Sequence, residues 1–276
     1  MSYTCFEVTV ADHVAHVQLN RPDELNTMVP AFWNDLPRIV SDLSDEGSTR
    51  AVVISSTGKH FSAGMDLSVF TSSGLMNDAE AGRRNATFSL LVRKLQDSFT
   101  ALEQVRMPVL AAIQGGCIGG AVDMVCAADM RYATADAFFV VQETNIGMTA
   151  DVGTLQRLPK LIPDGVAREF IYTGRRMTAQ RAYEVGLVNE VFADHDALIS
   201  GTLAIATEIA QKSPLTIWGA KEALVYARDH SVPDSLHQIS LWQTGAFQPA
   251  DMMEAFAAKG EKRPAVYPDL PSAPSL

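Results

Sequence analysis

Hydrophobic positions along the first two thirds of the chain predict short strands that alternate with helices. Residues 6–22 alternate hydrophobic and polar side chains around a short polar centre, which is typical of a β-hairpin. Apolar runs at 50–58 and 107–116 predict buried strands. Helical spacing predicts helices at 31–47 and 86–105, so this part of the chain indicates an α/β core.

The middle of the chain places glycines and acids next to predicted elements. A helix is expected at 119–129, followed by strands within 130–143 that close at Glu143. Residues 152–162 are expected to form a short helix that Asp151 could cap. The acids therefore lie at the ends of elements, where loops form binding sites.

Strand patterns stop near residue 193, and helical patterns follow at 196–211, 215–229 and 234–247, before the segment 249–264. This order predicts an α/β core with a helical appendage that begins near residue 200. The polar segment 71–85 is expected to be mobile, and the Pro/Ser-rich tail 265–276 is expected to be disordered.

Composition narrows the class of protein. The net charge of −10 over 276 residues argues against a nucleic-acid surface, which needs clustered Lys and Arg. Three cysteines, Cys5, Cys117 and Cys126, have no CxxC spacing, so neither a disulfide framework nor a metal site is expected. No secretory signal or membrane-spanning run is visible, and a cytoplasmic location is expected.

Two glycine-containing loops are candidates for close approach of the backbone to a ligand. The stretch "GGCIGG" (115–120) follows an apolar strand and opens a helix, but Cys117 occupies the middle glycine of a dinucleotide-binding pattern, which weakens that interpretation. Amides at a helix N-terminus favour negative charge, and a charge that develops during a reaction would make such a loop an oxyanion hole. "FSAGMD" (61–66) is a second loop of this kind; either loop alone is more often a tight turn.

Three carboxylates lie among small and apolar residues: Asp123, Glu143 and Asp151. Each has a structural explanation on its own: a helix dipole for Asp123, a solvated strand end for Glu143 and a helix cap for Asp151. Together, beside the glycine loops, they fit a pocket that raises carboxyl pKa values.

These stretches resemble one known family. "HFSAGMDL", "GGCIGGAVDMVCAADMRYATADAFFVVQE", "TGRRMTAQRAYEVGLVNEV" and "SPLTIWGAKEAL" occur in the order found in the crotonase, or enoyl-CoA hydratase/isomerase, superfamily. The resemblance implies an α/β, crotonase-like spiral of ββα units over 1–195, which carries the CoA and active sites. It also implies a helical region over 196–276 that forms a homotrimer or a homohexamer.

The resemblance also implies an acyl-CoA substrate and no further cofactor, metal, nucleic acid or membrane. The backbone amides of Met65 and Gly120 would form the oxyanion hole. Ala63, Gly64, Asp66 and Leu67 would join them in lining the substrate site. Lys221 and the segment 259–264 are candidates either for contacts with the CoA phosphates or for solvated helix surface.

The acids indicate a subfamily. Asp123, Glu143 and Asp151, with "ADVGTLQRLPK", resemble the Δ3,5-Δ2,4-dienoyl-CoA isomerases of fatty-acid β-oxidation. Moving two double bonds requires a proton to leave C2 and another to arrive at C6, which makes a second acid useful. The hypothesis is that Glu143 is the base at C2, Asp151 the acid at C6, and Asp123 a tuning group; the two proton-transfer roles could also be reversed.

Two other functions remain open at this point. A 2-enoyl-CoA hydratase needs two acids and the same oxyanion hole, although Asp123 is one methylene shorter than the Glu usual in hydratases. A non-catalytic acyl-CoA-binding homologue is the other alternative, since fold alone does not define function.

Overall fold

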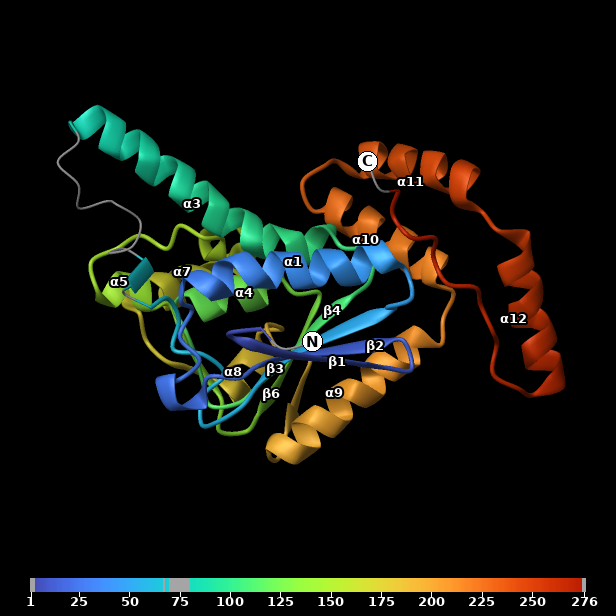
Figure 1. Cartoon of the computed structure of the whole chain (residues 1–276), viewed down its shortest axis with the longest axis horizontal. Coiled ribbons are helices and arrows are strands. Elements are labelled where there is room, and N and C mark those ends of the chain that lie inside the picture. The colour runs from blue at the N-terminus through green and yellow to red at the C-terminus, as the bar shows by residue number, and fades with distance from the viewer. Residues whose placement is uncertain (1–2, 67, 70–79, 275–276) are drawn as a thin grey trace.

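The computed structural model describes residues 3–66, 68–69 and 80–274. Its larger sheet has the strand order β1-β2-β3-β4-β6-β9 and is parallel except for the β1–β2 hairpin (Figure 1). A smaller sheet has the order β5-β7-β8. The strands are β1 (Phe6–Ala11), β2 (Val14–Leu19), β3 (Ala51–Ser56), β4 (Val109–Ile113), β5 (Gly116–Ile118), β6 (Met130–Thr134), β7 (Phe138–Val140), β8 (Met177–Thr178) and β9 (Glu190–Phe192).

Helices connect the strands and form the C-terminal end of the chain. They are the 3-10 turn η1 (Pro22–Glu24), α1 (Pro30–Glu46), α3 (Ala81–Gln104), α4 (Gly120–Ala127), α5 (Gln142–Asn145), α6 (Thr154–Leu161), α7 (Asp164–Thr173), α8 (Ala179–Glu184), α9 (His195–Ala210), α10 (Pro214–Ala227), α11 (Val232–Ala246) and α12 (Pro249–Glu261). The predicted α/β class and the helical C-terminal end are confirmed.

Both faces of the large sheet are covered, and this explains the apolar runs in the sequence. Along β3, Val52 and Ile54 belong to the core that includes Phe32 of α1 and Phe99 of α3. Val53, which points to the opposite face, packs with Leu198 of α9 and its neighbours. Every residue of β3 is buried, as expected for a strand with helices on both sides.

The predicted hairpin is also confirmed, and its turn shows why the chain reverses there. Asp12 and His13 have φ values of 49° and 65°, so the two-residue loop has the left-handed backbone that matches the twist of the flanking strands. The register pairs Ala11 with Val14 and Phe6 with Leu19.

Helix α3 begins earlier than its hydrophobic pattern predicted. It starts at Ala81 because the Glu80 side chain accepts a hydrogen bond from the Arg83 amide and caps the first turn. The end of the segment predicted to be mobile, 81–85, is therefore helical, which corrects that expectation. Residues 71–79 of the same segment lie outside the described residues.

The prediction of a disordered tail is wrong for its described part. Residues 264–274, here called the C-terminal strap, return from α12 to the core. The buried Arg50 donates to Asp269 Oδ1 and to the Tyr267 carbonyl, both at 2.7 Å, and the Ala273 amide donates to the Asp45 carbonyl at 2.7 Å. Charged and backbone hydrogen bonds order this segment despite its low hydrophobicity. The division of the chain at 195/196 stays a prediction.

Candidate active site

Two neighbouring parallel strands bring the predicted site residues to one edge of the small sheet. Ile118 at the end of β5 lies opposite Val140 at the end of β7, and the Gly119 amide donates to the Val140 carbonyl at 2.9 Å. Because parallel strands present their carboxyl ends on the same side, the start of α4 and the start of α5 lie next to each other.

The two glycine loops come close together there. Gly64 has φ of +89°, and a Cβ at this position would lie 2.6 Å from the Ile118 carbonyl oxygen, so only glycine fits. Gly120 opens α4, and the amide of a first helical residue has no acceptor within its helix. A Cβ on Gly120 would lie 3.8 Å from the Met65 amide nitrogen. The structure thus places Met65 and Gly120 side by side; their role as an oxyanion hole stays a prediction.

Asp123 lies in the first turn of α4 and is 1% exposed. Its Oδ1 accepts a hydrogen bond from the Thr154 amide at 2.6 Å, while its Oδ2 has no hydrogen-bond partner among the described residues. Burial raises the pKa of Asp123 to about 6, with a contribution from the charge of Asp151, against the lowering effect of the Thr154 hydrogen bonds. An acid in this state is balanced between its two protonation forms near neutral pH.

Glu143 belongs to the short helix α5, not to the end of a strand as predicted. Its carboxyl group lies next to the glycine loop 115–120, since a Cβ on Gly119 would lie 3.2 Å from Glu143 Oε1. Burial, together with the negative charges of Asp123 and Asp151, raises the pKa of Glu143 to about 7. Glu143 therefore keeps its proton up to a higher pH than an ordinary glutamate does.

Asp151 lies in the loop before α6 and does not cap that helix, which corrects one of the sequence-based interpretations. The N-cap position is Gly153, and it makes no side-chain hydrogen bond. The free amide of Thr154 is instead satisfied by Asp123 from α4. Asp151 instead lines the cavity described below, and partial burial raises the pKa of its carboxyl group.

The three acids line one cavity together with Ala63, Met65 and Gly120. Its remaining wall is largely apolar and comes mainly from α3 and the loops after α5: Phe88, Leu91, Val92, Leu95, Ile146, Met148 and Val152. Sequence patterns gave no reason to include these side chains, because their spacing on α3 indicated only a packed helix face. An apolar channel beside buried acids suits a hydrocarbon chain that exchanges protons.

The other predicted substrate-binding residues lie at or outside the cavity edge. The Asp66 carboxylate accepts a hydrogen bond from the Ser68 amide at 2.8 Å, and the hydrogen bonds with the side chain and the amide of Ser68 lower the pKa of Asp66. Gly64 packs against the Ile118 carbonyl of the neighbouring glycine loop and does not line the cavity. Leu67 lies outside the described residues. Cys117 and Cys126 are buried, free and apolar in their surroundings, as predicted. Among the described residues no cluster of side chains suited to holding a metal ion is found.

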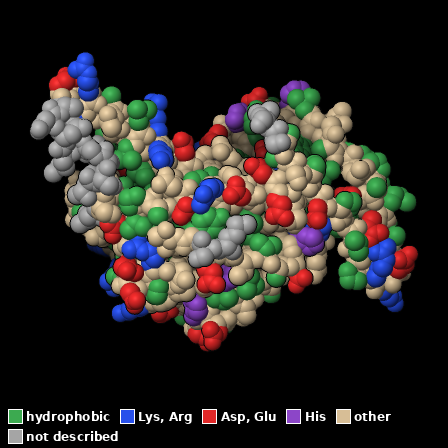
Figure 2. Space-filling view, in the orientation of Figure 1, with side chains coloured by type: hydrophobic (Ala, Val, Ile, Leu, Met, Phe, Trp, Pro, Cys, Tyr) green, Lys and Arg blue, Asp and Glu red, His purple; other side chains and the backbone are tan. Residues whose placement is uncertain are grey.

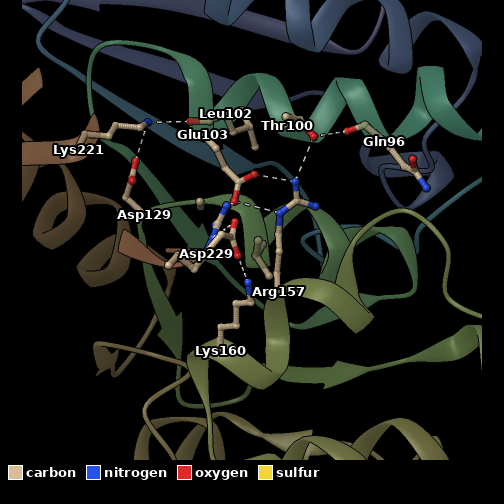
Figure 3. Close-up of polar contacts among 12 residues, drawn as sticks. Gln96, Thr100, Leu102, Glu103, Asp129, Arg157, Lys160, Lys221 and Asp229 are labelled. Carbon is tan, nitrogen blue, oxygen red and sulfur yellow. Dashed lines mark hydrogen bonds and ion pairs between the residues drawn. The ribbon is translucent and has the colours of Figure 1, made fainter. Parts of the chain in front are cut away.

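Neither interpretation of Lys221 is correct. Lys221 is 5% exposed, and its Nζ donates to Asp129 Oδ2 at 2.9 Å and to the Leu102 carbonyl (Figure 3). The same Nζ also donates to the Met107 carbonyl at 3.0 Å. A lysine held by three acceptors in the protein interior is structural. In the segment 259–264, Arg263 forms ion pairs with Glu254 and Glu261.

Comparison with known proteins gives the family. The model described as enoyl-CoA hydratase/isomerase matches residues 9–270. A mitochondrial Delta(3,5)-Delta(2,4)-dienoyl-CoA isomerase from Mus musculus is 43% identical, covering 95% of this chain and 81% of its own length. A peroxisomal protein of the same name from Arabidopsis thaliana is 38% identical, covering 91% of each chain. The chain belongs to the enoyl-CoA hydratase/isomerase family.

The fold agrees with this assignment. The crystal structure of an enoyl-CoA hydratase from Bacillus anthracis superposes with a TM-score of 0.85 at 32% identity and covers 96% of this chain and 99% of that chain. None of the helices in the described part of the chain is long and apolar enough to cross a membrane.

Proposed function

We propose that this protein isomerises 3,5-dienoyl-CoA thioesters to 2,4-dienoyl-CoA thioesters. The observation that carries the proposal is the set of three carboxyl groups with raised pKa values in one apolar cavity, beside the Met65 and Gly120 amides. The relatives named as Delta(3,5)-Delta(2,4)-dienoyl-CoA isomerases support the same reaction. An enzyme that only moves protons along a chain needs such acids and no redox group.

In the proposed reaction the thioester oxygen accepts hydrogen bonds from the amides of Met65 and Gly120. Glu143, whose carboxyl group lies next to Gly119, removes a proton from C2. The electrons spread over an extended enolate whose charge the two amides stabilise, with each amide contributing roughly 3 kcal/mol by analogy with other oxyanion sites. The proton of Asp151 then arrives at C6, and the double bonds occupy positions 2 and 4.

Asp123 has an indirect part in this proposal. Its Oδ1 is occupied by the Thr154 amide, so it holds the start of α6 while its charge raises the pKa of Glu143. Its buried Oδ2 faces the same cavity and suits a bound water. Asp123 thus tunes and supports the pair that transfers protons.

No cofactor is needed beyond the coenzyme A of the substrate. We also propose a homotrimer, or a dimer of trimers, built through the C-terminal helices. Figure 2 shows hydrophobic side chains on this end of the molecule. The exposed large hydrophobic residues of α11, α12 and the turn between them include Leu236, Leu241, Phe247, Met253 and Phe256, which are 52–64% exposed. A role in fatty-acid β-oxidation and a cytoplasmic location stay predictions, because the relatives above are named mitochondrial and peroxisomal.

The test uses 3,5-octadienoyl-CoA and follows the absorbance of the conjugated 2,4-dienoyl thioester. We expect the absorbance to rise with the wild type and to fall to background with Asp151→Asn. Asp42→Asn, at an exposed position on α1, is the matched control and should behave as the wild type. Hydration of crotonyl-CoA without isomerisation would identify a hydratase, and binding without either reaction would identify a non-catalytic homologue; both results would contradict the proposal.

A further inference from the structure

Helix α3 presents three polar side chains to the loop that carries Asp151. Gln96, Thr100 and Glu103 are four and three residues apart, so they share one face of the helix. Figure 3 shows Thr100 and Glu103 of this face directed at Arg157 of α6. None of the three is among the residues that line the cavity. One face of α3 therefore lines the cavity, and another face of α3 contacts the loop that carries Asp151 and the start of α6.

Gln96 contacts the backbone of Asp151 directly. Its Nε2 donates to the Asp151 carbonyl oxygen at 2.7 Å. A good hydrogen bond from a half-buried side chain restrains the peptide group that follows the Asp151 Cα. Since the carboxyl group projects from that same Cα, this bond also restrains where the carboxyl group can point.

Arg157 fixes the other end of the loop through a two-point ion pair. Its Nε lies 3.1 Å from Glu103 Oε1 and its Nη2 lies 2.7 Å from Glu103 Oε2, with side-chain exposures of 12% and 8%. Nη2 also donates to Thr100 Oγ1 at 3.2 Å. A bidentate pair with this little solvent contact has one geometry, which distinguishes it from a surface salt bridge.

Gly153 lets the guanidinium of Arg157 lie directly over the loop. A Cβ at Gly153 would come within 1.9 Å of Arg157 Nη1, and the φ of Gly153 is +137°. On the opposite side the Thr154 amide is held by Asp123 of α4. The segment 151–154 is thus clamped between α4 on one side and the polar face of α3 on the other.

We propose that Gln96 is a positioning residue that sets the Asp151 carboxyl group for proton transfer, with the Arg157–Glu103 pair holding the loop in the same place. This inference rests on the proposed function, because it gives Asp151 a proton to move. Neither Gln96 nor Glu103 touches the reacting atoms. Misplacing a reacting group by about 1 Å costs up to about a hundredfold in rate, so even a small displacement is measurable.

The test compares Gln96→Met with Gln104→Met, the same substitution at an exposed position on α3. Two rates are measured: isomerisation of 3,5-octadienoyl-CoA, and exchange of the C2 hydrogens with deuterated water. Asp151→Asn establishes first which of the two rates depends on Asp151. We expect Gln96→Met to lower that rate about tenfold with little change in KM or in thermal midpoint, and Gln104→Met to match the wild type.

Several results would overturn the inference. A Gln96→Met enzyme with the wild-type kcat would show that the bond to Asp151 has no positioning role, and so would a loss whose pattern differs from that of Asp151→Asn. If Gln96→Met fails to fold, Arg157→Lys keeps the charge and removes the two-point geometry, and it should reproduce the Asp151→Asn pattern in part. An inactive wild type would reject both the function and the inference, whereas an active wild type with an unaffected Gln96→Met would reject the inference alone.

Discussion

The proposed reaction predicts a loss of activity at alkaline pH. One of the two transferring acids must be ionised and the other protonated, whichever acts at C2, so the active enzyme carries one proton on the pair. The pKa of Glu143 is raised to about 7 by burial and by the charges of Asp123 and Asp151, so the pair still holds a proton up to about that pH. Above that pH the pair gives up the shared proton that the reaction needs.

The magnitude follows from the pKa. Above about 7 the fraction of enzyme that still holds the shared proton falls tenfold for each pH unit, so kcat/KM at about pH 9 should be about one hundredth of its maximum. A glutamate with an ordinary pKa near 4.3 would already have lost its proton at neutral pH, and activity would then be low throughout this range.

The assay is the initial rate of absorbance change with 3,5-octadienoyl-CoA between about pH 5 and about pH 9, with the thermal midpoint measured at each pH. Asp123→Asn removes one of the charges that raise the pKa of Glu143, so its alkaline decline should begin at a lower pH. Constant kcat/KM up to about pH 9 in a protein that stays folded would refute the shared proton, and an unmoved decline in Asp123→Asn would refute the tuning role of Asp123.

Three further predictions concern stability and the glycine loop. The pKa of Asp123 is raised from 3.8 to about 6 in the folded protein, so between these pH values the folded state binds more protons than the unfolded state, and the free energy of unfolding should fall by about 3 kcal/mol as the pH rises from the lower to the higher value. Urea unfolding of Asp123→Asn should show a weaker dependence of the free energy of unfolding on pH. The same dependence as in the wild type would contradict the raised pKa of Asp123. Gly64→Ala should lower kcat about a hundredfold by moving the Met65 amide, while Gly165→Ala, where a Cβ meets open space, should have no effect on kcat; equal rates would exclude a role for that amide. Asp269→Asn should lower the free energy of unfolding by about 1 kcal/mol and speed proteolysis of the C-terminal strap, and an unchanged cleavage rate would show that the backbone contacts alone hold the strap.

Local patterns were sufficient to predict most of the fold. The hairpin at residues 6–22, the buried run of β3 and the helices of the C-terminal end each follow from periodicities within one element. The apolar neighbours of the acids and the adjacent glycine loops suggested a shared pocket, but the roles of the acids came from the resemblance to a family motif. Their proximity depends on the pairing of β5 with β7, which joins residues far apart in the chain.

Three of the errors share a physical cause, since each of the three involves a contact between distant segments. Asp151 looked like a helix cap because the cap that satisfies the Thr154 amide comes from Asp123, 31 residues earlier. Lys221 looked like a surface cation because its partner Asp129 lies between α4 and β6, 92 residues earlier in the chain. The tail looked disordered because the guanidinium that binds it is near the start of β3. No window of local sequence contains these partners.

Arg50 has a consequence for the whole C-terminal end. The same side chain donates to the Ala210 carbonyl at the end of α9 and to Tyr267 and Asp269 in the C-terminal strap. Both ends of the segment 211–266 are therefore joined to the core through this one side chain, which closes the segment into a ring by hydrogen bonds instead of a covalent link. A single cut in the exposed turn between α10 and α11 would leave both new chain ends attached to the core, so a nicked molecule should stay in one piece until it unfolds.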